Sequence, residues 1–257
     1  MKKKKLSKKN NFIYIYGKHP AFSALNNSRR IIEKVYVEKK NTSLLKKVND
    51  IILQYPRKII INEVTNIFFD KLLGQRVKHQ GIALEAMKLE TFNYTNIFNY
   101  DLKGRVYGVM LDNLNDPHNV GAIYRSAYMF NSNFIITSFN NNPIETTGLL
   151  ISSSGTYEKV STYIANNLTN AIQHFKKNGW WVLGLDHDAK KNLDDVLFNY
   201  KDQKKLLIVL GSEGKGIRRL IKENCDILIK INTFDQKLSL NVSNAAAIVF
   251  NQLYNKK

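Results

Sequence analysis

The sequence predicts an α/β protein in which a small α/β domain precedes a larger domain built on a parallel sheet. From residue 105 onward, segments with the patterns of strands and helices alternate, as is typical of a parallel sheet covered by helices on both faces. Residues 106–111 are apolar almost throughout, as expected of a strand buried on both sides. Residues 89–104 interrupt the alternation with asparagines and aromatic residues in no regular period. We interpret them as a linker between the two domains.

The first domain is expected to cover residues 11–88, after a lysine-rich basic tail at residues 1–10. Its apolar runs predict strands at 13–16, 35–37, 59–61 and 81–86, with a helix at 20–26. A second helix is predicted at 42–55, where apolar residues recur at helical spacing, namely Leu44, Leu45, Val48, Ile51 and Ile52.

The second domain is expected to cover residues 105–257. Its predicted strands are 106–111, 134–137, 180–185 and 206–210, and its predicted helices are 119–130, 168–178 and 240–254. Gly179 follows the middle helix, in the position that glycine commonly takes after a helix end.

The composition is that of a globular protein with a strongly basic surface. Hydrophobic residues make up 44% of the 257 residues, which argues against a disordered chain, and the formal net charge is +18. A positive field attracts polyanions, so the charge favours nucleic acid as the partner over a membrane surface. The chain is also crowded with lysine, asparagine and isoleucine, and a coding bias toward these residues stays open as a second explanation of the charge.

The single cysteine, Cys225, excludes a disulfide within the chain and a metal site built from several cysteines. It favours a reducing, cytoplasmic compartment. No apolar stretch reaches the length of a membrane-spanning helix, so no membrane association is expected. The histidines are scattered along the sequence, and no metal is expected.

The first motif follows the apolar strand at 106–111. A polar turn with Pro117 leads into a helix, for which Asn119 would be a good N-cap. Arg125 follows six residues later. The motif would place an amide and a guanidinium at the carboxyl edge of a strand, where open α/β sheets bind ligands. A cap and a solvated arginine remain the alternative interpretation.

The second motif is a glycine-rich turn after the strand at 206–210. Three glycines within six residues, Gly211, Gly214 and Gly216, allow the backbone to approach a ligand closely. The spacing matches neither a P-loop nor the dinucleotide fingerprint. Glu213 would repel phosphate, whereas it suits a cation or ribose hydroxyls, so a sulfonium cofactor with a ribose fits better than ATP. The alternative is an ordinary strand-to-helix turn with Glu213 facing solvent.

The third motif, at residues 238–249, opens the last helix. Ser239 and Asn241 lie where that helix begins, and both residue types are common helix caps. The alanines at 245–247 would allow close backbone packing.

Taken together, these segments resemble the three motifs of the SpoU (TrmH-like) methyltransferases of the SPOUT superfamily. The resemblance rests on Asn119 with Arg125, on residues 210–216 and on residues 239–243, in the same order and spacing. The N-terminal part resembles the small L30e-like substrate-binding domain of that family through residues 17–19, 24–25 and 79–83.

The resemblance implies an enzyme that moves a methyl group from S-adenosylmethionine to a ribose 2′-hydroxyl of structured RNA. The two-domain layout is most similar to enzymes that methylate a guanosine in 23S ribosomal RNA. Transfer RNA as the acceptor, or a catalytically silent RNA-binding protein on the same scaffold, are the alternatives. The resemblance also implies a deep trefoil knot in the second domain and a homodimer.

The resemblance further implies a set of site residues. Arg125 would act on the hydroxyl, and Asn119, Glu213, Ser239 and Asn241 would complete the catalytic site. The cofactor would contact Leu210, Gly211, Glu213, Gly214, Gly216, Ile231, Leu240, Asn241 and Ser243. The sequence departs from the family pattern at 231–237, where an isoleucine–proline pair and a glycine are usual.

Overall fold

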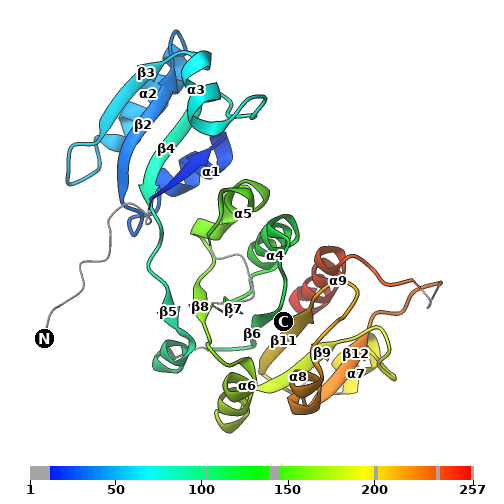
Figure 1. Ribbon diagram of the computed structural model, residues 1–257. Helices are drawn as coiled ribbons and strands as arrows, with labels where there is room; N and C mark the ends of the chain where they lie inside the picture. The colour runs from blue at the N-terminus through cyan, green and yellow to red at the C-terminus, as the bar shows by residue number, and fades with distance from the viewer. Residues whose placement is uncertain (1–11, 102, 139–144, 200–201, 236–237, 256–257) are drawn as a thin grey trace, which may run out of the picture. The chain divides into compact units, whose positions relative to one another are not determined.

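The contacts of the chain form two compact units, seen in the computed structural model of Figure 1. The first unit comprises Met1–Glu90 and Glu145–Lys159, and the second comprises Thr91–Ile144 and Val160–Lys257. The structure describes residues 12–101, 103–138, 145–199, 202–235 and 238–255. The predicted basic tail lies outside these residues.

The first unit contains a mixed four-stranded sheet in the order β1-β4-β2-β3. These strands are β1 (Phe12–Tyr16), β2 (Ile32–Glu38), β3 (Ile60–Val64) and β4 (Ile82–Met87). Strands β1 and β2 run antiparallel to β4, while β3 runs parallel to β2. The helices between them are α1 (Lys18–Leu25), α2 (Thr42–Ile52) and α3 (Asn66–Leu73). The predicted α/β unit is confirmed, with α3 as an addition.

Helix α3 was not predicted from the sequence, because it is short and its apolar residues do not fall on one clear face. Its Phe69 is fully buried and stacks on His79, with ring centroids 4.1 Å apart. Helix α2, in contrast, was predicted from residues close together in the sequence. The side chain of Asn41 caps it by accepting a hydrogen bond from the Leu44 amide, and Leu44 and Val48 are buried.

The segment Glu145–Lys159 packs with the first unit, although the sequence places it inside the predicted domain 105–257. It forms helix α5 (Thr147–Ser152) and a short 3-10 helix, η3 (Thr156–Glu158). The physical reason is a buried ion-pair cluster, in which Arg30 contacts the carboxylates of both Glu145 and Glu158.

The second unit is built on an eight-stranded sheet in the order β10-β12-β9-β11-β6-β7-β8-β5, in which every strand pair is parallel. The strands are β5 (Phe92–Asn93), β6 (Val106–Asp112), β7 (Phe134–Thr137), β8 (Thr162–Ile164), β9 (Trp181–Leu185), β10 (Lys191–Asn192), β11 (Lys205–Gly211) and β12 (Ile227–Lys230). The predicted parallel sheet is confirmed. The deep trefoil knot implied by the resemblance stays a prediction.

Helices cover both faces of this sheet. Helices α4 (Pro117–Met129) and α9 (Val242–Asn255) pack together on one face, where the Tyr107 and Phe250 rings lie 5.8 Å apart. Helices α6 (Leu168–Lys177) and α8 (Arg219–Asn224) pack on the other, where Phe134 meets Phe175 at 5.9 Å. A further helix, α7 (Leu193–Asn199), precedes β11.

The predicted linker at 89–104 is largely ordered structure. It forms β5 and a 3-10 helix, η2 (Tyr94–Asn99). Ile97 is buried in the core of the second unit, and the Phe98 ring lies 4.9 Å from that of Phe175. The aromatic residues that broke the sequence pattern are therefore core contacts.

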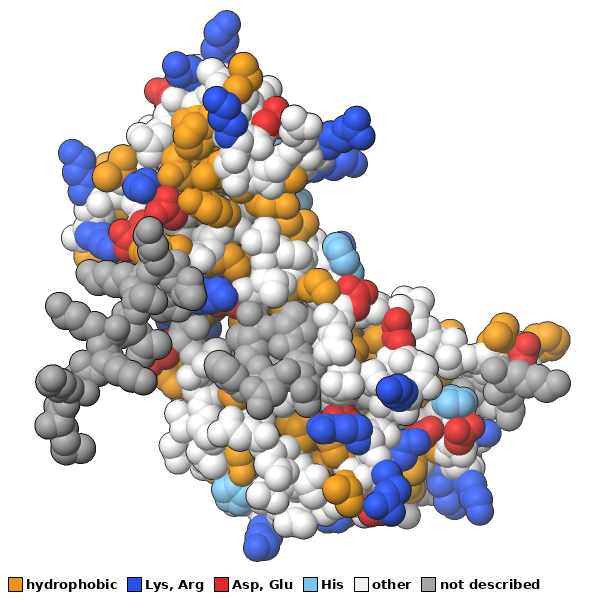
Figure 2. Space-filling model, viewed as in Figure 1, with side chains coloured by type: hydrophobic (Ala, Val, Ile, Leu, Met, Phe, Trp, Pro, Cys, Tyr) orange, Lys and Arg blue, Asp and Glu red, His pale blue; other side chains and the backbone are white. Residues whose placement is uncertain are grey.

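None of the helices in the described part of the chain combines the length and apolarity needed to cross a membrane. On the face seen in Figure 2, lysine and arginine side chains lie over both units, interspersed with acidic ones.

Candidate active site

The first two motifs meet because their strands are neighbours. Strands β6 and β11 pair in parallel, with Leu111 opposite Leu210 and Asp112 opposite Gly211. The chain moves outward from β6 in both directions across the sheet, through β7 on one side and β11 on the other. Ligands of open α/β sheets bind where the strand order reverses in this way, outside the carboxyl ends of the strands. The topology therefore places both motifs at that edge.

Helix α4 does not begin where the sequence predicts. Its N-cap is Asp116, whose carboxylate accepts a hydrogen bond of 2.9 Å from the His118 amide, and Pro117 occupies the first turn. The predicted cap, Asn119, lies instead inside that turn. Because Asp116 satisfies the free amides, the Asn119 side chain is available for another partner.

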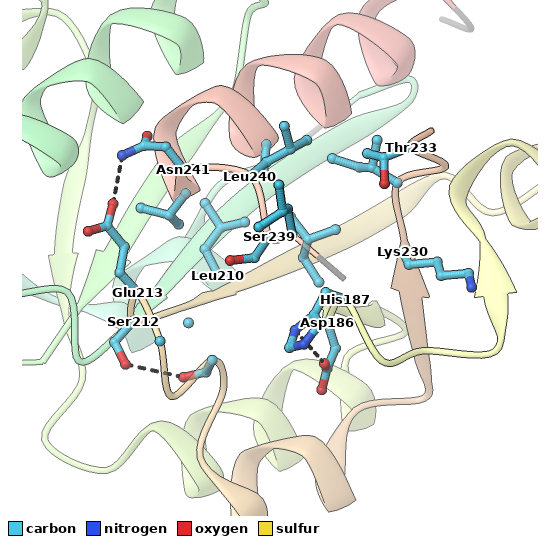
Figure 3. Close-up of a pocket in the computed structure, with 18 residues that line it drawn as sticks. Asp186, His187, Leu210, Ser212, Glu213, Lys230, Thr233, Ser239, Leu240 and Asn241 are labelled. Carbon is cyan, nitrogen blue, oxygen red and sulfur yellow. Dashed lines mark hydrogen bonds and ion pairs between the residues drawn. The ribbon is translucent and has the colours of Figure 1, made fainter. Parts of the chain in front are cut away.

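That partner is Glu213, from the glycine-rich loop. The Asn119 side-chain amide donates a hydrogen bond of 2.7 Å to Glu213 Oε1. Asn241 Nδ2 lies 2.6 Å from the same oxygen and 3.0 Å from Asn119 Oδ1. One residue from each motif thus joins a single polar cluster, part of which Figure 3 shows.

Asn241 is held in place from its other side. Its Oδ1 accepts hydrogen bonds from the backbone amide and the hydroxyl of Ser243, at 2.9 and 2.6 Å. Asn241 is therefore the cap of α9, as the sequence predicted. Its amide oxygen serves the helix and its amide nitrogen serves the cluster, which fixes the orientation of the side chain.

The glycine-rich loop closes on itself. Ser212 and Gly216 exchange two backbone hydrogen bonds of 3.1 and 2.8 Å. A Cβ atom on Gly211 would lie 2.2 Å from the carbonyl carbon of Gly216 and from the amide nitrogen of Ile217. Because both are backbone atoms, only glycine permits this turn.

An ion pair between the buried Asp112 and the exposed Arg218 anchors the far end of the loop. Asp112, fully buried at the end of β6, accepts hydrogen bonds from the backbone amide and Nε of Arg218, at 2.8 and 2.7 Å. Sequence reasoning missed this pair, because the two residues lie 106 positions apart. The only sequence signal was an aspartate at the end of an otherwise apolar strand.

Beside the polar cluster lies a cavity of about 450 Å³. Nine of the predicted site residues line it, namely Leu210, Gly211, Glu213, Gly214, Gly216, Ile231, Ser239, Leu240 and Asn241. A tenth, Asn119, belongs to the cluster at its edge through its hydrogen bond to Glu213. Ser243 is absent from the lining and acts through Asn241.

The loop after β9 forms another wall that the sequence did not predict. Asp186 and His187 line the cavity, together with Lys230 and Thr233 (Figure 3). Burial alone would raise the pKa of Asp186, but hydrogen bonds from Lys222 and the Asp188 amide and the charge of Lys222 outweigh it. The pKa of Asp186 therefore lies below its ordinary value, and the group is a carboxylate near neutral pH.

Arg125 lies apart from this cluster. It is exposed, it does not line the cavity, and it has no hydrogen-bond or ion-pair partner among the described residues. Six residues of helix separate it from Asn119, which corresponds to a rotation of about 240° around the helix axis. The structure thus unites the three motifs but leaves this guanidinium facing solvent.

Comparison with known families decides what this arrangement belongs to. Residues 107–251, more than half of the chain, match the SpoU rRNA Methylase family. The chain belongs to this family. Residues 14–92 match a second family, described as RNA 2′-O ribose methyltransferase substrate binding. The two matches identify this SpoU methylase as a member of the RNA 2′-O-ribose methyltransferases.

The matches to similar proteins cover almost the whole chain. YacO of Bacillus subtilis, assigned to the TrmH family of tRNA/rRNA methyltransferases, is 29% identical over 253 residues, covering 95% of this chain and 96% of YacO. The fold is shared with AviRb, a SpoU methyltransferase of Streptomyces viridochromogenes solved with AdoMet, with a TM-score of 0.78, 16% identity and coverage of 96% and 90%. The fold is also shared with an AdoMet-bound rRNA methyltransferase of Sinorhizobium meliloti, with a TM-score of 0.79 and 16% identity. That match covers 95% of this chain and 87% of the other.

Proposed function

We propose that this SpoU methylase transfers the methyl group of S-adenosylmethionine to the ribose 2′-hydroxyl of a guanosine in 23S ribosomal RNA. The observation that supports the methyl transfer is the cluster of Asn119, Glu213 and Asn241, which brings the three motifs together beside the 450 Å³ cavity. The choice of acceptor follows from the resemblance of the two-domain layout. Transfer RNA is the alternative acceptor, since relatives such as YacO are described by both RNA classes. A silent RNA-binding protein is the alternative from another class.

The cavity fits S-adenosylmethionine in size and chemistry. Its volume lies within the range of about 300–1,000 Å³ typical of small-molecule sites. Apolar side chains suited to an adenine ring, including Leu210, Ile231 and Leu240, line it together with the carboxylate of Glu213. When bound, the cofactor would supply an activated methyl group on a positive sulfur.

The protein's own residues would mainly position the cofactor and the acceptor, because the methyl group on sulfur is already activated. Glu213 is fixed by the amides of Asn119 and Asn241, so its negative charge is presented at a defined place. Such a charge favours a cation over a phosphate. Ser239 lines the cavity beside it, where its hydroxyl is placed to donate or accept a hydrogen bond.

Arg125 would act on the RNA. A guanidinium near a positive sulfur would be repelled, whereas RNA phosphates and a developing alkoxide attract it. Its exposed position on α4, with no described partner, leaves its donors available for an RNA strand. We assign it the role of holding a phosphate or the alkoxide, because a guanidinium almost never gives up its proton.

Ribose-methylation mapping of total RNA, from cells with and without this protein, tests the proposal directly. We expect one guanosine of 23S ribosomal RNA to lose its methyl group in the deletion strain. A lost site in transfer RNA would select the alternative acceptor. An unchanged map would favour the silent binding protein.

The predicted homodimer and the knot follow from the family resemblance alone and are part of this proposal. Sedimentation of the purified protein at micromolar concentration would give about twice the monomer mass if the dimer forms.

A further inference from the structure

A second cavity, of about 650 Å³, lies in the first unit, away from the motifs. Helix α1 supplies most of one wall with Lys18, His19 and Phe22, and η3 with its following residue, Lys159, supplies the other. Lys18 and His19 lie four and three residues before Phe22, and Asn26 lies four residues after it, so these side chains share one face at α1. Both lysines and His19 are exposed, and Phe22 is half-buried.

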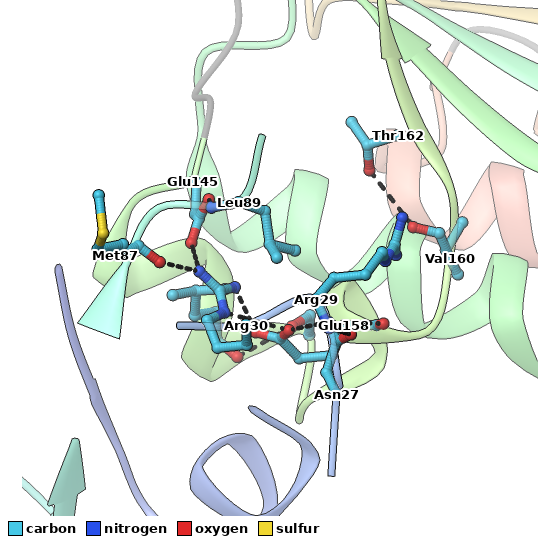
Figure 4. A network of polar contacts seen from close by, with 11 residues as sticks. Asn27, Arg29, Arg30, Met87, Leu89, Glu145, Glu158, Val160 and Thr162 are labelled. Atoms are coloured by element: carbon cyan, nitrogen blue, oxygen red, sulfur yellow. Dashed lines mark hydrogen bonds and ion pairs between the residues drawn. The ribbon is translucent and has the colours of Figure 1, made fainter. Parts of the chain in front are cut away.

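Among the residues that line the cavity, one is a carboxylate, and it is buried and engaged by other side chains. Glu158 lines the cavity, but its side chain is 2% exposed and is bound by the guanidinium of Arg30. The side-chain amide of Asn27 donates a second hydrogen bond to Glu158, of 2.7 Å, as Figure 4 shows. The exposed charged side chains at the cavity are therefore those of Lys18 and Lys159, together with the imidazole of His19.

The walls are held at a fixed separation. Arg30 also contacts Glu145 and donates a hydrogen bond of 2.8 Å to the Met87 carbonyl, which ties the segment carrying η3 to the sheet. Gly155, with φ of +86°, lets η3 approach α1 closely. A Cβ there would lie 2.3 Å from the Ser23 hydroxyl and 2.9 Å from a backbone carbonyl of α1. The ion pairs of Arg30 and the close approach at Gly155 thus hold the two walls of the cavity together.

We propose that this cavity binds an unpaired nucleotide of the RNA substrate. Proteins recognise unpaired nucleotides by stacking bases on aromatic rings and by holding the backbone with cations. Phe22 and His19 supply the rings, and Lys18 and Lys159 supply the cations. The site rests on the proposed function in taking RNA as the partner, and it adds where and in what form that RNA is held.

The test compares two lysine pairs that change the net charge equally. Lys18→Ala with Lys159→Ala removes the cations of the cavity, and Lys46→Ala with Lys47→Ala removes two exposed lysines of α2 outside it. The probe is a fluorescein-labelled 12-nucleotide single-stranded RNA, compared with a 12-base-pair duplex. We expect the cavity pair to weaken single-strand binding about tenfold or more, and the α2 pair to weaken it less than threefold.

The salt dependence of binding gives a second readout. Loss of two phosphate contacts should lower the slope of log K against log salt by about 1.4 for a single strand. A matched ring test follows, in which Phe22→Leu weakens binding and Phe22→Tyr restores it, because leucine keeps apolar volume but lacks a stacking face. Equal losses for both lysine pairs, or an unchanged slope for the cavity pair, would overturn the proposal.

Cofactor calorimetry on the same variants separates this inference from the proposed function. The lysine and Phe22 variants should keep wild-type affinity for S-adenosylmethionine and the wild-type melting temperature. If the wild-type protein binds no cofactor but the lysine pairs still differ, the methyltransferase proposal fails and the RNA site stands.

Discussion

The side-chain amide of Asn241 donates a hydrogen bond of 2.6 Å to the carboxylate of Glu213, a residue 28 positions earlier in the sequence. Asn241 caps α9 with its oxygen while its nitrogen fixes Glu213. The start of a helix and the orientation of a carboxylate therefore depend on one side chain. This coupling makes the cluster open to mutational dissection.

Glu213→Gln should weaken S-adenosylmethionine binding about tenfold, equivalent to about 1.4 kcal/mol. The variant removes a negative charge that would face a positive sulfur. S-adenosylhomocysteine, whose sulfur is neutral, should lose less affinity. Calorimetry with both ligands measures the difference. Glu223→Gln on α8 is the matched control, because Glu223 pairs with Arg219 outside the cavity. Equal losses for the two ligands would argue against a charge effect at Glu213.

Arg125→Ala should lower the single-turnover rate of methyl transfer about a hundredfold, comparable to losing one donor to a developing charge. Cofactor affinity and melting temperature should hardly change, because Arg125 is exposed and has no described partner. Arg125→Lys should restore little of the rate, since a point charge lacks the planar fork of donors. A near-normal rate for folded Arg125→Ala would remove it from the mechanism.

Gly211→Ala should abolish cofactor binding by displacing the loop, because the new methyl group would meet two backbone atoms at 2.2 Å. Gly179→Ala, outside the cavity, is the control. Its Cβ would point into open space, so only the strain of a φ of +76° would be added, about 1 kcal/mol. Calorimetry should show no binding for the first variant and binding within severalfold of wild type for the second. Normal binding by Gly211→Ala would mean that the loop is more adaptable than its contacts indicate.

Arg30→Met should destabilise the protein by about 3–5 kcal/mol at pH 7, because it leaves two buried carboxylates without a cation. Burial already raises the pKa of Glu145 above its ordinary value despite the contact with Arg30. A carboxyl group whose folded-state pKa is raised destabilises the fold above that pKa, and the penalty disappears as pH falls toward its unfolded value.

The melting temperature of Arg30→Met should therefore recover toward wild type as the pH is lowered from 7 and Glu145 takes up a proton. Adding Glu145→Gln and Glu158→Gln should restore much of the stability at pH 7. A deficit that does not change with pH would point to lost packing rather than unpaired charge.

The sequence predicted those features that depend on local pattern. The parallel sheet follows from apolar strands alternating with helices, and the cap at Asn241 follows from a favoured residue type at a helix start. The predicted start of α4 at Asn119 was wrong, although the sequence carries a local signal for the true start. Asp116 before Pro117 is a better helix-start signal than Asn119. Proline is favoured at the first helical position, directly after a capping residue.

Other features depend on contacts between distant residues and carry no local signal. Arg30 lies 115 and 128 positions from its two carboxylate partners. Arg218 lies 106 positions from Asp112. Nothing near either arginine in the sequence distinguishes it from the many solvated cations of this chain. The cavity wall formed by Asp186 and His187 escaped prediction for the same reason, because it becomes a wall only when β9 pairs with β11.

The return of Glu145–Lys159 to the first unit means that the chain passes between the two units three times rather than once. No single cut can therefore release both units intact. An exchange of RNA-binding modules between relatives would have to transplant this insert along with the N-terminal residues. Otherwise the hybrid would carry Arg30 or its two carboxylates without the matching charge.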